Sequence, residues 1–402
     1  MSLKIKVGKS GLQDIKHLIW HITEKNRVIK ATPAEDISAV FRINETAKRL
    51  HPDYQKMKII DVIEHDGAGA KTFIFKAKNA AYFRAGQYLS VSLEIDGSVL
   101  TRPYSISSSP AWSKEGKYAI TVRRTPNGFA SDWILDNWSV GDSVTVSEPL
   151  GNFFYEELRD CKDVIALAGG SGITPFLSMA YAIRDKAEDF NLTILFGSRN
   201  ADSILFKDEL DAISKECDKV KIVHVLSEQK KKGFENGFIN ADIISKYAPK
   251  DKEYSVFMCG PEAMYRFAEG ELNKLGLDRK HIRRELLGVT KKVWEQEGYP
   301  SEAKGKTFSV TVHMGNEEKT IPAFADEPVL VAIERAGIAA PSRCRSGECG
   351  WCRSKLISGE VYVPEENDEG RRWSDRENGY IHPCSSFALS DLILEVPTTY
   401  IK

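Results

Sequence analysis

The chain has 402 residues, enough for two to four domains, and its 42% apolar and 28% charged residues are ordinary for a globular protein. Its formal net charge of −1 excludes a strong overall field that would favour nucleic acid or an anionic membrane. No apolar run approaches the ~18 residues of a membrane-spanning helix, and the first residues lack the pattern of a signal peptide.

Residues 1–54 are predicted to form a short, mainly helical N-terminal extension whose role the sequence does not reveal. Apolar groups at 17–20 and 40–43 indicate short amphipathic helices, and Pro33 and Pro52 interrupt the helical pattern. Lys and Arg outnumber Asp and Glu in this segment by ten to six. The extension has no place in the three-domain pattern that follows it.

The segment 55–157 is predicted to form a small antiparallel β-barrel. Short stretches in which apolar and polar residues alternate are separated by Gly and Pro turns, which is typical of such barrels. These strand-like stretches are 59–63, 72–75, 88–93, 118–122 and 143–146.

Two short motifs in the barrel segment suit a flavin nucleotide: Arg102-Pro103-Tyr104-Ser105 and Gly128-Phe129-Ala130-Ser131. An arginine can neutralise a phosphate, a tyrosine ring can lie flat on the isoalloxazine, and a serine hydroxyl can reach the ring's redox nitrogen. The glycine-led turn presents backbone N–H groups and a hydroxyl to a pyrophosphate. By itself, the first motif is equally compatible with a plain turn before an edge strand.

Residues 158–288 are predicted to form an α/β domain with a parallel sheet, because apolar strands alternate with helical stretches. The strands are expected at 164–168, 192–196, 221–225 and 255–258. Directly after the first strand comes Gly169-Gly170-Ser171-Gly172-Ile173-Thr174-Pro175. Glycines let the backbone approach a pyrophosphate, and the N-terminus of the following helix favours its negative charge. The turn is not the G-x-G-x-x-G fingerprint, so a tight turn without a ligand is the alternative.

Two further segments at the ends of strands concern the nicotinamide nucleotide. Cys259-Gly260-Pro261 ends the last strand, at the sheet edge where ligands of open α/β sheets bind. The alternative is a buried cysteine that acts as a small hydrophobe. Ser198-Arg199 follows the second strand and could hold the 2′-phosphate of NADPH. No acidic residue stands there to bind a 2′-hydroxyl, yet the choice between NADH and NADPH stays open.

A polar linker is predicted at 289–304, and the last domain, 305–402, contains four grouped cysteines: Cys344, Cys349, Cys352 and Cys384. Their spacing, C-x4-C-x2-C with a distant fourth cysteine, is the plant-type spacing for a [2Fe–2S] cluster. Structural zinc sites usually come as two C-x2-C pairs, so zinc is the weaker interpretation. Glycine and small polar residues in the loop suit backbone N–H groups directed at the cluster sulfurs.

The other three cysteines are scattered single thiols: Cys161, Cys217 and Cys259. Scattered thiols fit a reducing cytoplasm better than a disulfide framework. Cys161 and Cys217 lie outside any motif and are expected to be packing residues.

The order of the motifs resembles the ferredoxin–NADP reductase superfamily, in which R-x-Y-S, G-x-x-S, G-G-x-G-x-T-P and C-G-P follow one another. Residues 305–402 resemble plant-type ferredoxins, which implies a β-grasp fold with the four grouped cysteines as cluster ligands. The domain order resembles the reductase components of phthalate dioxygenase and phenylacetyl-CoA epoxidase. The resemblance covers residues 57–402.

The resemblance also implies roles for single residues. It assigns flavin contacts to the two barrel motifs and to Val122-Arg123, and it implies FAD rather than FMN, because FMN-binding relatives tend to lack the G-x-x-S element. It places the nucleotide motifs against the nicotinamide, so the candidate catalytic residues are Cys259, Ser105 and Thr174. Relatives carry an acidic or aromatic residue near Glu285, but a charge beside a linker is expected to be solvated.

These parts predict an NAD(P)H-dependent oxidoreductase. Electrons are expected to pass from NAD(P)H through FAD to the [2Fe–2S] cluster, and then to a partner oxygenase, hydroxylase or other metalloprotein. One alternative is an electron-transfer subunit of a larger complex, aerobic or anaerobic, that docks through residues 1–54. A second alternative is a non-enzymatic adaptor that binds zinc, which would lack the visible absorption of flavin and cluster.

Overall fold

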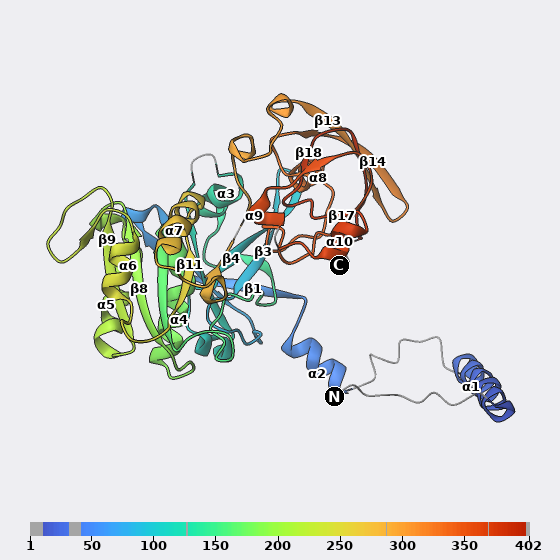
Figure 1. Ribbon diagram of the computed structural model, residues 1–402, viewed down its shortest axis with the longest axis horizontal. Coiled ribbons are helices and arrows are strands. Elements are labelled where there is room, and N and C mark those ends of the chain that lie inside the picture. Colours follow the sequence, from blue (N-terminus) through green and yellow to red (C-terminus); the bar gives the residue numbers. More distant parts are fainter. Residues whose placement is uncertain (1–10, 32–41, 126–127, 287, 369, 399–402) are drawn as a thin grey trace. The chain divides into compact units, whose positions relative to one another are not determined.

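The computed structural model describes residues 11–31, 42–125, 128–286, 288–368 and 370–398 (Figure 1). The chain divides into two compact units, Met1–His51 and Pro52–Lys402. None of the helices in the described residues is long and apolar enough to cross a membrane.

The N-terminal unit contains α1 (Leu12–Ala31) and α2 (Arg42–Leu50). The predicted helix at 17–20 lies within α1 and is confirmed. The predicted helix at 40–43 begins outside the described residues, and its second half lies in α2. α1 exposes several large apolar side chains, each more than half accessible to solvent: Ile15, Leu18, Ile19, Trp20, Ile22 and Ile29.

The first sheet of Pro52–Lys402 is an antiparallel half-barrel, which confirms the predicted barrel class. Its strands, in the order β4-β3-β6-β1-β2-β5, are β1 (Tyr54–His65), β2 (Ala70–Lys76), β3 (Tyr88–Ile95), β4 (Ser98–Ser105), β5 (Lys117–Arg123) and β6 (Ser143–Ser147). Inward side chains such as Phe73 and Phe75 are fully buried and meet the edge of the Trp138 ring. This aromatic packing holds α3 (Phe129–Asn137), which precedes Trp138, close to the barrel.

The second sheet is parallel throughout, which confirms the predicted α/β class. Its strands, in the order β10-β9-β8-β7-β11-β12, are β7 (Asp163–Gly169), β8 (Asn191–Ser198), β9 (Val220–Leu226), β10 (Glu235–Asn236), β11 (Ser255–Cys259) and β12 (Ile282–Arg284). The accompanying helices are α4 (Thr174–Arg184), α5 (Lys207–Glu216), α6 (Ala241–Tyr247) and α7 (Glu262–Lys274).

Both faces of the parallel sheet are buried, because successive side chains of β7 join two different cores. Ala166 and Ala168 belong to a core that contains residues of α4 and α5. Ile165 and Leu167 belong to the core that contains residues of α6 and α7. Because both faces are covered, ligands can bind only at the two ends of the strands, where loops enter and leave the sheet. We call these the amino edge and the carboxyl edge of the sheet.

The third sheet is mixed, and its β13–β19 pair is parallel. The strands, in the order β14-β13-β19-β15-β17, are β13 (Thr307–Met314), β14 (Glu317–Phe324), β15 (Ser354–Ser358), β17 (Tyr380–Ile381) and β19 (Leu392–Glu395). The remaining elements are α8 (Val329–Arg335), α9 (Glu365–Asp368), α10 (Trp373–Glu377) and the pair β16 (Val361–Tyr362) and β18 (Phe387–Ala388). A mixed sheet whose core includes α8 agrees with the β-grasp expectation.

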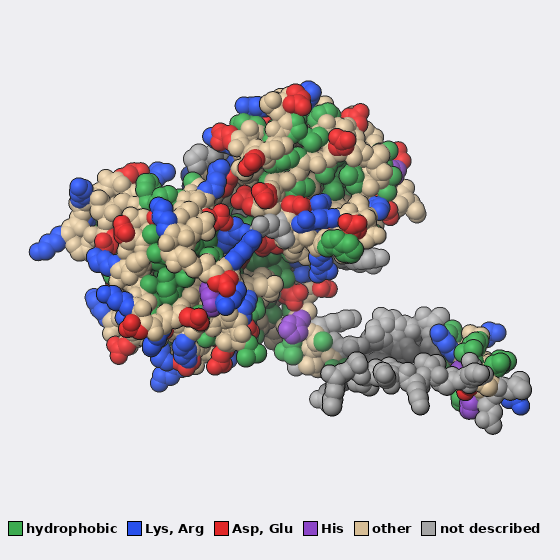
Figure 2. All heavy atoms as spheres, in the orientation of Figure 1, with side chains coloured by type: hydrophobic (Ala, Val, Ile, Leu, Met, Phe, Trp, Pro, Cys, Tyr) green, Lys and Arg blue, Asp and Glu red, His purple; other side chains and the backbone are tan. Residues whose placement is uncertain are grey.

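The segment expected as a polar linker, 289–304, packs closely against the ferredoxin part. Val293, Tyr299 and Ala303 are buried in one cluster with Ala325 and Phe387. The Tyr299 hydroxyl donates a hydrogen bond of 3.2 Å to the carbonyl of Ala325. On the face seen in Figure 2, Lys and Arg side chains are interspersed with Asp and Glu, as the near-zero net charge suggests.

Candidate functional site

The four grouped cysteines come together in the loop that precedes β15 and in the turn after β17. Three of them, Cys344, Cys352 and Cys384, are buried, whereas Cys349 is exposed. Hydrogen bonding to the thiols of Cys349 and Cys384 lowers the pKa of Cys344. The neighbouring thiols of Cys344 and Cys352 raise the pKa of Cys384, so the four cysteines act on one another.

Backbone N–H groups point at these sulfurs, as the small residues of the loop predict. The amides of Ser346 and Cys349 donate to Cys344 Sγ at 3.5 and 3.4 Å, and the amide of Trp351 donates to Cys349 Sγ at 3.4 Å. Such donors stabilise the negative charge that thiolates and bridging sulfides carry in an iron–sulfur cluster.

The distances between the cysteine sulfurs bear on whether the site holds an iron–sulfur cluster or a zinc ion. One zinc ion would hold all its sulfur ligands within about 4.6 Å of one another, because each Zn–S bond is about 2.3 Å long. Within the part of the chain that the structure describes, three Cys, His, Asp or Glu donor atoms lie within 4.8 Å of one another only at Cys161, Glu253 and His281. No three of the four grouped sulfurs form such a group, which agrees with a two-iron cluster, whose four thiolate ligands are divided between two metal ions.

The cluster loop is tied to the flavin strand β4. The hydroxyl of Thr101 lies 2.7 Å from the hydroxyl of Ser342 and donates to the Ser342 carbonyl at 3.1 Å. The Ser90 hydroxyl on β3 donates to the carbonyl of Arg343 at 3.5 Å. Arg343 in turn lies 3.7 Å from Glu148 and stacks on the Trp351 ring, with 3.5 Å between its guanidinium carbon and the ring centroid.

A buried carboxylate, Glu334 of α8, lies between two arginines. One of its oxygens is 3.7 Å from Arg102 Nη1, and the other pairs with Nη1 of Arg345. Arg345 follows the first cluster cysteine and has a left-handed backbone, with φ of 62°, which costs a non-glycine residue free energy unless its surroundings hold it there. The ion pair with Glu334 is such a restraint, and it connects the cluster loop to the R-P-Y-S motif.

The first flavin motif lies at the end of β4. Arg102 is partly buried, and burial, together with the nearby charge of Arg345, lowers its pKa to about 10. Burial raises the pKa of Tyr104, and Ser105 is buried beside Tyr88, its partner on β3. Pro103 occupies a ladder position opposite Ser90. Two guanidinium groups share one carboxylate here, so the motif keeps an excess positive charge that suits a flavin phosphate.

The second flavin motif forms the start of α3, with Gly128 at its N-cap and Ser131 in its first turn. A Cβ at Gly128 would lie 2.9 Å from the backbone carbonyl oxygen of Thr125, so a side chain fits there only if the backbone shifts. Ser131 Oγ is 3.4 Å from Asp132 Oδ1, which also accepts the amide of Thr125 at 3.2 Å. Ala130 is buried in the barrel core. The turn therefore offers one hydroxyl and backbone amides, as the motif predicts.

Val122 and Arg123 have different surroundings. Val122 is fully buried in the barrel core. Arg123 donates from Nε to the Ala68 carbonyl at 3.2 Å, and its Nη1 would lie 2.6 Å from a Cβ at Gly170. Burial, and then the charge of Arg199, lowers the pKa of Arg123. Arg123 thus stands at the glycine turn, where its charge suits a pyrophosphate.

The glycine turn and the C-G-P segment lie against each other. A Cβ at Gly172 would lie 2.1 Å from the carbonyl oxygen of Cys259, so a side chain cannot fit there. A Cβ at Gly169 would lie 2.9 Å from Pro261. Thr174 begins α4 and donates from Oγ1 to the Ser171 carbonyl at 3.0 Å. The two nicotinamide motifs are therefore one site, formed where β7 and β11 end side by side.

Glu285 was expected to be solvated, and this prediction is wrong. Only 7% of Glu285 is exposed, and its amide donates to the Met258 carbonyl at 3.0 Å. Burial raises its pKa well above the usual range, and the charges of Glu348 and Cys344 act in the same direction. The sequence misled because β12 joins the parallel sheet beside β11, which carries the chain into the interior before it leaves the domain.

The carboxyl group of Glu285 acts on the thiol of Cys259. Cys259 is buried, and burial followed by the charge of Glu285 raises its pKa. The Tyr265 hydroxyl accepts from the Gly260 amide at 3.2 Å and donates to the Glu285 carbonyl at 2.5 Å. Burial therefore favours the neutral forms of the Cys259 thiol and the Glu285 carboxyl at the carboxyl ends of these strands.

Arg199 lies at the end of β8 and is largely exposed. Its Nε is 3.8 Å from Glu228 Oε1, and the Glu228 amide donates to the Arg199 carbonyl at 2.9 Å. Ser198 Oγ is buried and has no hydrogen-bond partner among the described residues. The carboxylate of Glu228, which is distant in sequence, pairs with Arg199 at the position where the sequence predicts a contact to a 2′-phosphate.

Three family models match the chain in the order of its sheets. They are "Oxidoreductase FAD-binding domain" at residues 59–155, "Oxidoreductase NAD-binding domain" at 166–270 and "2Fe-2S iron-sulfur cluster binding domain" at 312–389. The chain therefore has an FAD-binding, an NAD-binding and a [2Fe–2S] domain.

Known proteins resemble the chain over most of its length. The glycine betaine monooxygenase reductase subunit of Chromohalobacter salexigens is 30% identical over 340 residues, which cover 81% of this chain and 91% of that protein. The ferredoxin reductase component of 3-ketosteroid-9-alpha-monooxygenase of Rhodococcus rhodochrous is 27% identical, over 86% of this chain and 98% of that protein. The structure of phthalate dioxygenase reductase matches with a TM-score of 0.60 and 26% identity, over 86% of this chain and 98% of that chain.

The chain belongs to the family of FAD- and NAD-binding reductases that carry a C-terminal [2Fe–2S] ferredoxin domain. It is an NAD(P)H-dependent oxidoreductase that transfers electrons from NAD(P)H through FAD to its [2Fe–2S] cluster.

The burial of the Glu285 carboxyl predicts how the stability of the folded protein depends on pH. Its folded pKa lies above the unfolded value of about 4.3, so the stabilisation from its bound proton is complete below that pH and is lost as the pH rises toward the folded pKa. Glu285→Gln keeps the shape without titrating. The melting temperature of this variant minus that of the wild type should therefore increase from pH 5 to pH 8. The matching difference in the free energy of unfolding should increase by up to about 1.4 kcal/mol per pH unit.

Scanning calorimetry of the flavin- and cluster-loaded protein measures this difference. Glu302→Gln, at an exposed position, is the control and should show a constant difference across the same range. A Glu285→Gln difference that is flat or shrinks with pH would mean that Glu285 is ionised in the folded protein.

A second prediction concerns the ion pairs of Glu334 with Arg102 and Arg345, which we call the Glu334 bridge. Glu334→Gln leaves two buried guanidinium groups without their carboxylate, which should destabilise the folded protein by about 3 kcal/mol. Cytochrome c reduction by NADH, which needs the cluster, should fall relative to ferricyanide reduction by about threefold or more, the effect of ~0.7 kcal/mol on a barrier.

The control for this bridge is Glu327→Gln, which removes a carboxylate that pairs with Arg335 on the same domain. It should leave the ratio of the two activities unchanged. Equal ratios in the wild type and the Glu334→Gln variant, both fully loaded with flavin, would show that the bridge does not set electron passage.

Proposed function

We propose that this chain is the reductase component of an oxygenase system, and that its cluster passes electrons to a partner oxygenase, hydroxylase or related metalloprotein. The observation that carries the proposal is the tie between the cluster loop and the flavin strand, made by Thr101 with Ser342 and by Arg102 and Arg345 with Glu334. It joins the flavin motif to the cluster within one compact unit. The names of the relatives, which are reductase components of oxygenases, support the same class of partner.

We assign the segments 55–157, 158–288 and 305–402 to the FAD, nucleotide and ferredoxin domains, with 289–304 as the connection. When bound, FAD accepts a hydride from NAD(P)H and passes electrons singly to the cluster. The chain's own residues orient the partners of this step. The turn at Gly169–Thr174 with Arg123 holds the pyrophosphate, Cys259 limits where the nicotinamide can lie, and Ser105 contacts the flavin ring.

Glu285 holds a proton on its carboxyl group beside Cys259, at the edge of the sheet where the nicotinamide motifs meet. A neutral carboxyl does not repel the electrons that arrive at the flavin, whereas a carboxylate at this place would. Arg102, with the positive charge left over from the Glu334 bridge, neutralises a flavin phosphate.

We propose NADH as the preferred donor, because the carboxylate of Glu228 stands beside Arg199, where a 2′-phosphate would bind. We also propose a cytoplasmic location. All seven cysteines are free, and the four cluster ligands must stay reduced to bind iron.

The test of the proposed function separates the flavin from the cluster. Cys384→Ser removes one ligand, so the variant should lose the visible bands of the cluster and keep those of the flavin. Ferricyanide reduction by NADH should stay within about twofold of the wild type, while cytochrome c reduction should fall by about tenfold or more. NADH should give a higher kcat/KM than NADPH in both proteins.

Cys349→Ser, at an exposed position, repeats the experiment in case the first variant folds poorly, and Cys217→Ser is the control outside the cluster. Full cytochrome c reduction by a variant without cluster bands would refute the cluster as the exit for electrons. Transfer from the wild type to a purified oxygenase from the same source tests the partner class directly.

A second candidate is an electron-transfer subunit that docks on a larger redox complex through its N-terminal unit. The observation that favours it is the apolar face of α1, where Ile15, Leu18, Ile19 and Ile22 recur at helical spacing and are more than half exposed. An exposed row of this kind fits an apolar groove on a partner protein.

Deletion of residues 1–51 tests this docking role. The shortened protein should keep NADH–ferricyanide activity and cluster bands, because Pro52–Lys402 is a compact unit of its own. Transfer to the physiological partner should fall by about tenfold or more if α1 supplies a docking contact worth ~1.4 kcal/mol. Unchanged transfer would remove the docking role and leave the first proposal intact.

A further inference from the structure

Three metal-binding side chains meet at the amino edge of the nucleotide sheet, opposite the edge that carries the nicotinamide motifs. Cys161 stands two residues before β7, Glu253 two residues before β11, and His281 directly before β12. These strands are neighbours in the order β7-β11-β12, and all run in parallel. Residues that precede parallel neighbours meet at one edge, so the topology brings three distant parts of the sequence together.

The donor atoms of the three side chains form a compact group. Cys161 Sγ lies 3.4 Å from His281 Nδ1, and the thiol, imidazole and carboxylate atoms all lie within 4.8 Å of one another. Two ligands of a tetrahedral zinc ion, with Zn–S of about 2.3 Å and Zn–N of about 2.0 Å, are separated by about 3.5 Å. The observed thiol–imidazole distance matches this edge of a zinc tetrahedron.

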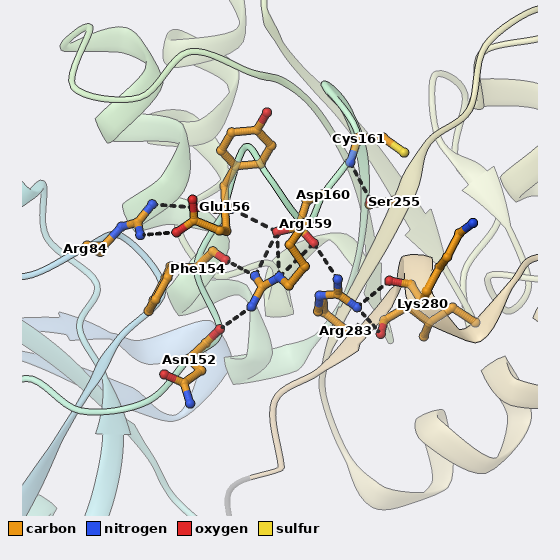
Figure 3. Close-up of polar contacts among 12 residues, drawn as sticks. Arg84, Asn152, Phe154, Glu156, Arg159, Asp160, Cys161, Ser255, Lys280 and Arg283 are labelled. Carbon is orange, nitrogen blue, oxygen red and sulfur yellow. Dashed lines mark hydrogen bonds and ion pairs between the residues drawn. The ribbon is translucent and has the colours of Figure 1, made fainter. Parts of the chain in front are cut away.

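Backbone and charged side chains fix the surroundings of Cys161. The Cys161 amide donates to Ser255 Oγ at 2.9 Å, which ties the segment before β7 to the start of β11 (Figure 3). The nearest cation on β12, Arg283, pairs with Asp160 at 2.9 Å, and Asp160 also pairs with Arg159 at 2.8 Å. The buried Asp160 carboxylate offsets only one of the two guanidinium charges, so the negative charge for a cation has to come from the Cys161 thiolate and the Glu253 carboxylate themselves.

We propose that Cys161, His281 and Glu253 form a Zn²⁺ site. A thiolate, an imidazole and a carboxylate are the ligand types that zinc takes from proteins, whereas Mg²⁺ and Ca²⁺ prefer oxygen alone. Three protein ligands leave the fourth position to water, and the site is only half-buried, so the ion exchanges with solvent. Cys161 was expected to be a packing residue, and the site gives it a role that its sequence surroundings do not signal.

The ion would fasten the amino ends of three strands. β12 leads within a few residues to the buried Glu285, so the zinc site anchors the strand that carries this carboxyl into the nicotinamide site. Binding to the folded state alone raises the melting temperature as the zinc concentration rises.

The test is a titration of the flavin- and cluster-loaded protein, freed of loose metal by a chelator, with zinc chloride. The wild type should bind one zinc per chain and melt at a higher temperature, while its visible spectrum shows that the cluster stays intact. Cys161→Ser and His281→Gln should each weaken zinc binding by about tenfold or more, and Glu253→Gln should weaken it less. Cadmium chloride should add the ultraviolet thiolate-to-metal band in the wild type and not in Cys161→Ser.

Cys217→Ser is the matched control, because Cys217 is the other half-buried thiol of this domain and belongs to no such group of donors among the described residues. It should bind zinc like the wild type. The proposal is overturned if the wild type binds no zinc, or if Cys161→Ser and His281→Gln bind it with unchanged affinity. Zinc bound only with loss of the cluster's visible bands would likewise overturn it, since the ion would then occupy the cluster cysteines.

Discussion

The carboxylate of Glu334, held between Arg102 and Arg345, is the interaction that connects the flavin motif to the cluster loop. Charges buried without partners cost several kcal/mol, so all three side chains must stay together once the interior forms. Arg345 belongs to the cluster loop and Arg102 to the flavin motif, so their common partner restrains both. The same pairing holds Arg345 in a left-handed backbone conformation that the loop requires between two cluster cysteines.

The parallel nucleotide sheet supplies the second constraint. Both of its faces are covered by helices, so only its two edges can carry chemistry. The carboxyl edge gathers the glycine turn, Cys259 and, through β12, the Glu285 carboxyl. The amino edge gathers the thiol, imidazole and carboxylate of the proposed zinc site. The nicotinamide site and the proposed zinc site therefore lie at opposite ends of the same strands, and the length of the strands keeps them apart.

The cofactors, which short motifs of neighbouring residues indicate, were predicted correctly. The cysteine spacing indicated a [2Fe–2S] cluster, and the matching family model confirms it. Glu285 was predicted wrongly, because a charge beside a linker is usually solvated and nothing local signals that β12 enters the sheet. Glu334 and Glu228 were missed for the same reason: each acts on an arginine that is distant in the sequence.

The sequence by itself determined the cofactors and their order, because glycine turns and cysteine spacings encode backbone geometry over a few residues. It also determined the fold classes, since the period of apolar residues changes from barrel to parallel sheet. The tertiary structure decided which sites contact one another and which ionisable side chains have shifted pKa values. Burial and ion pairing set the state of Glu285, Arg102 and Cys259, and both depend on which distant segments the sheets bring into contact.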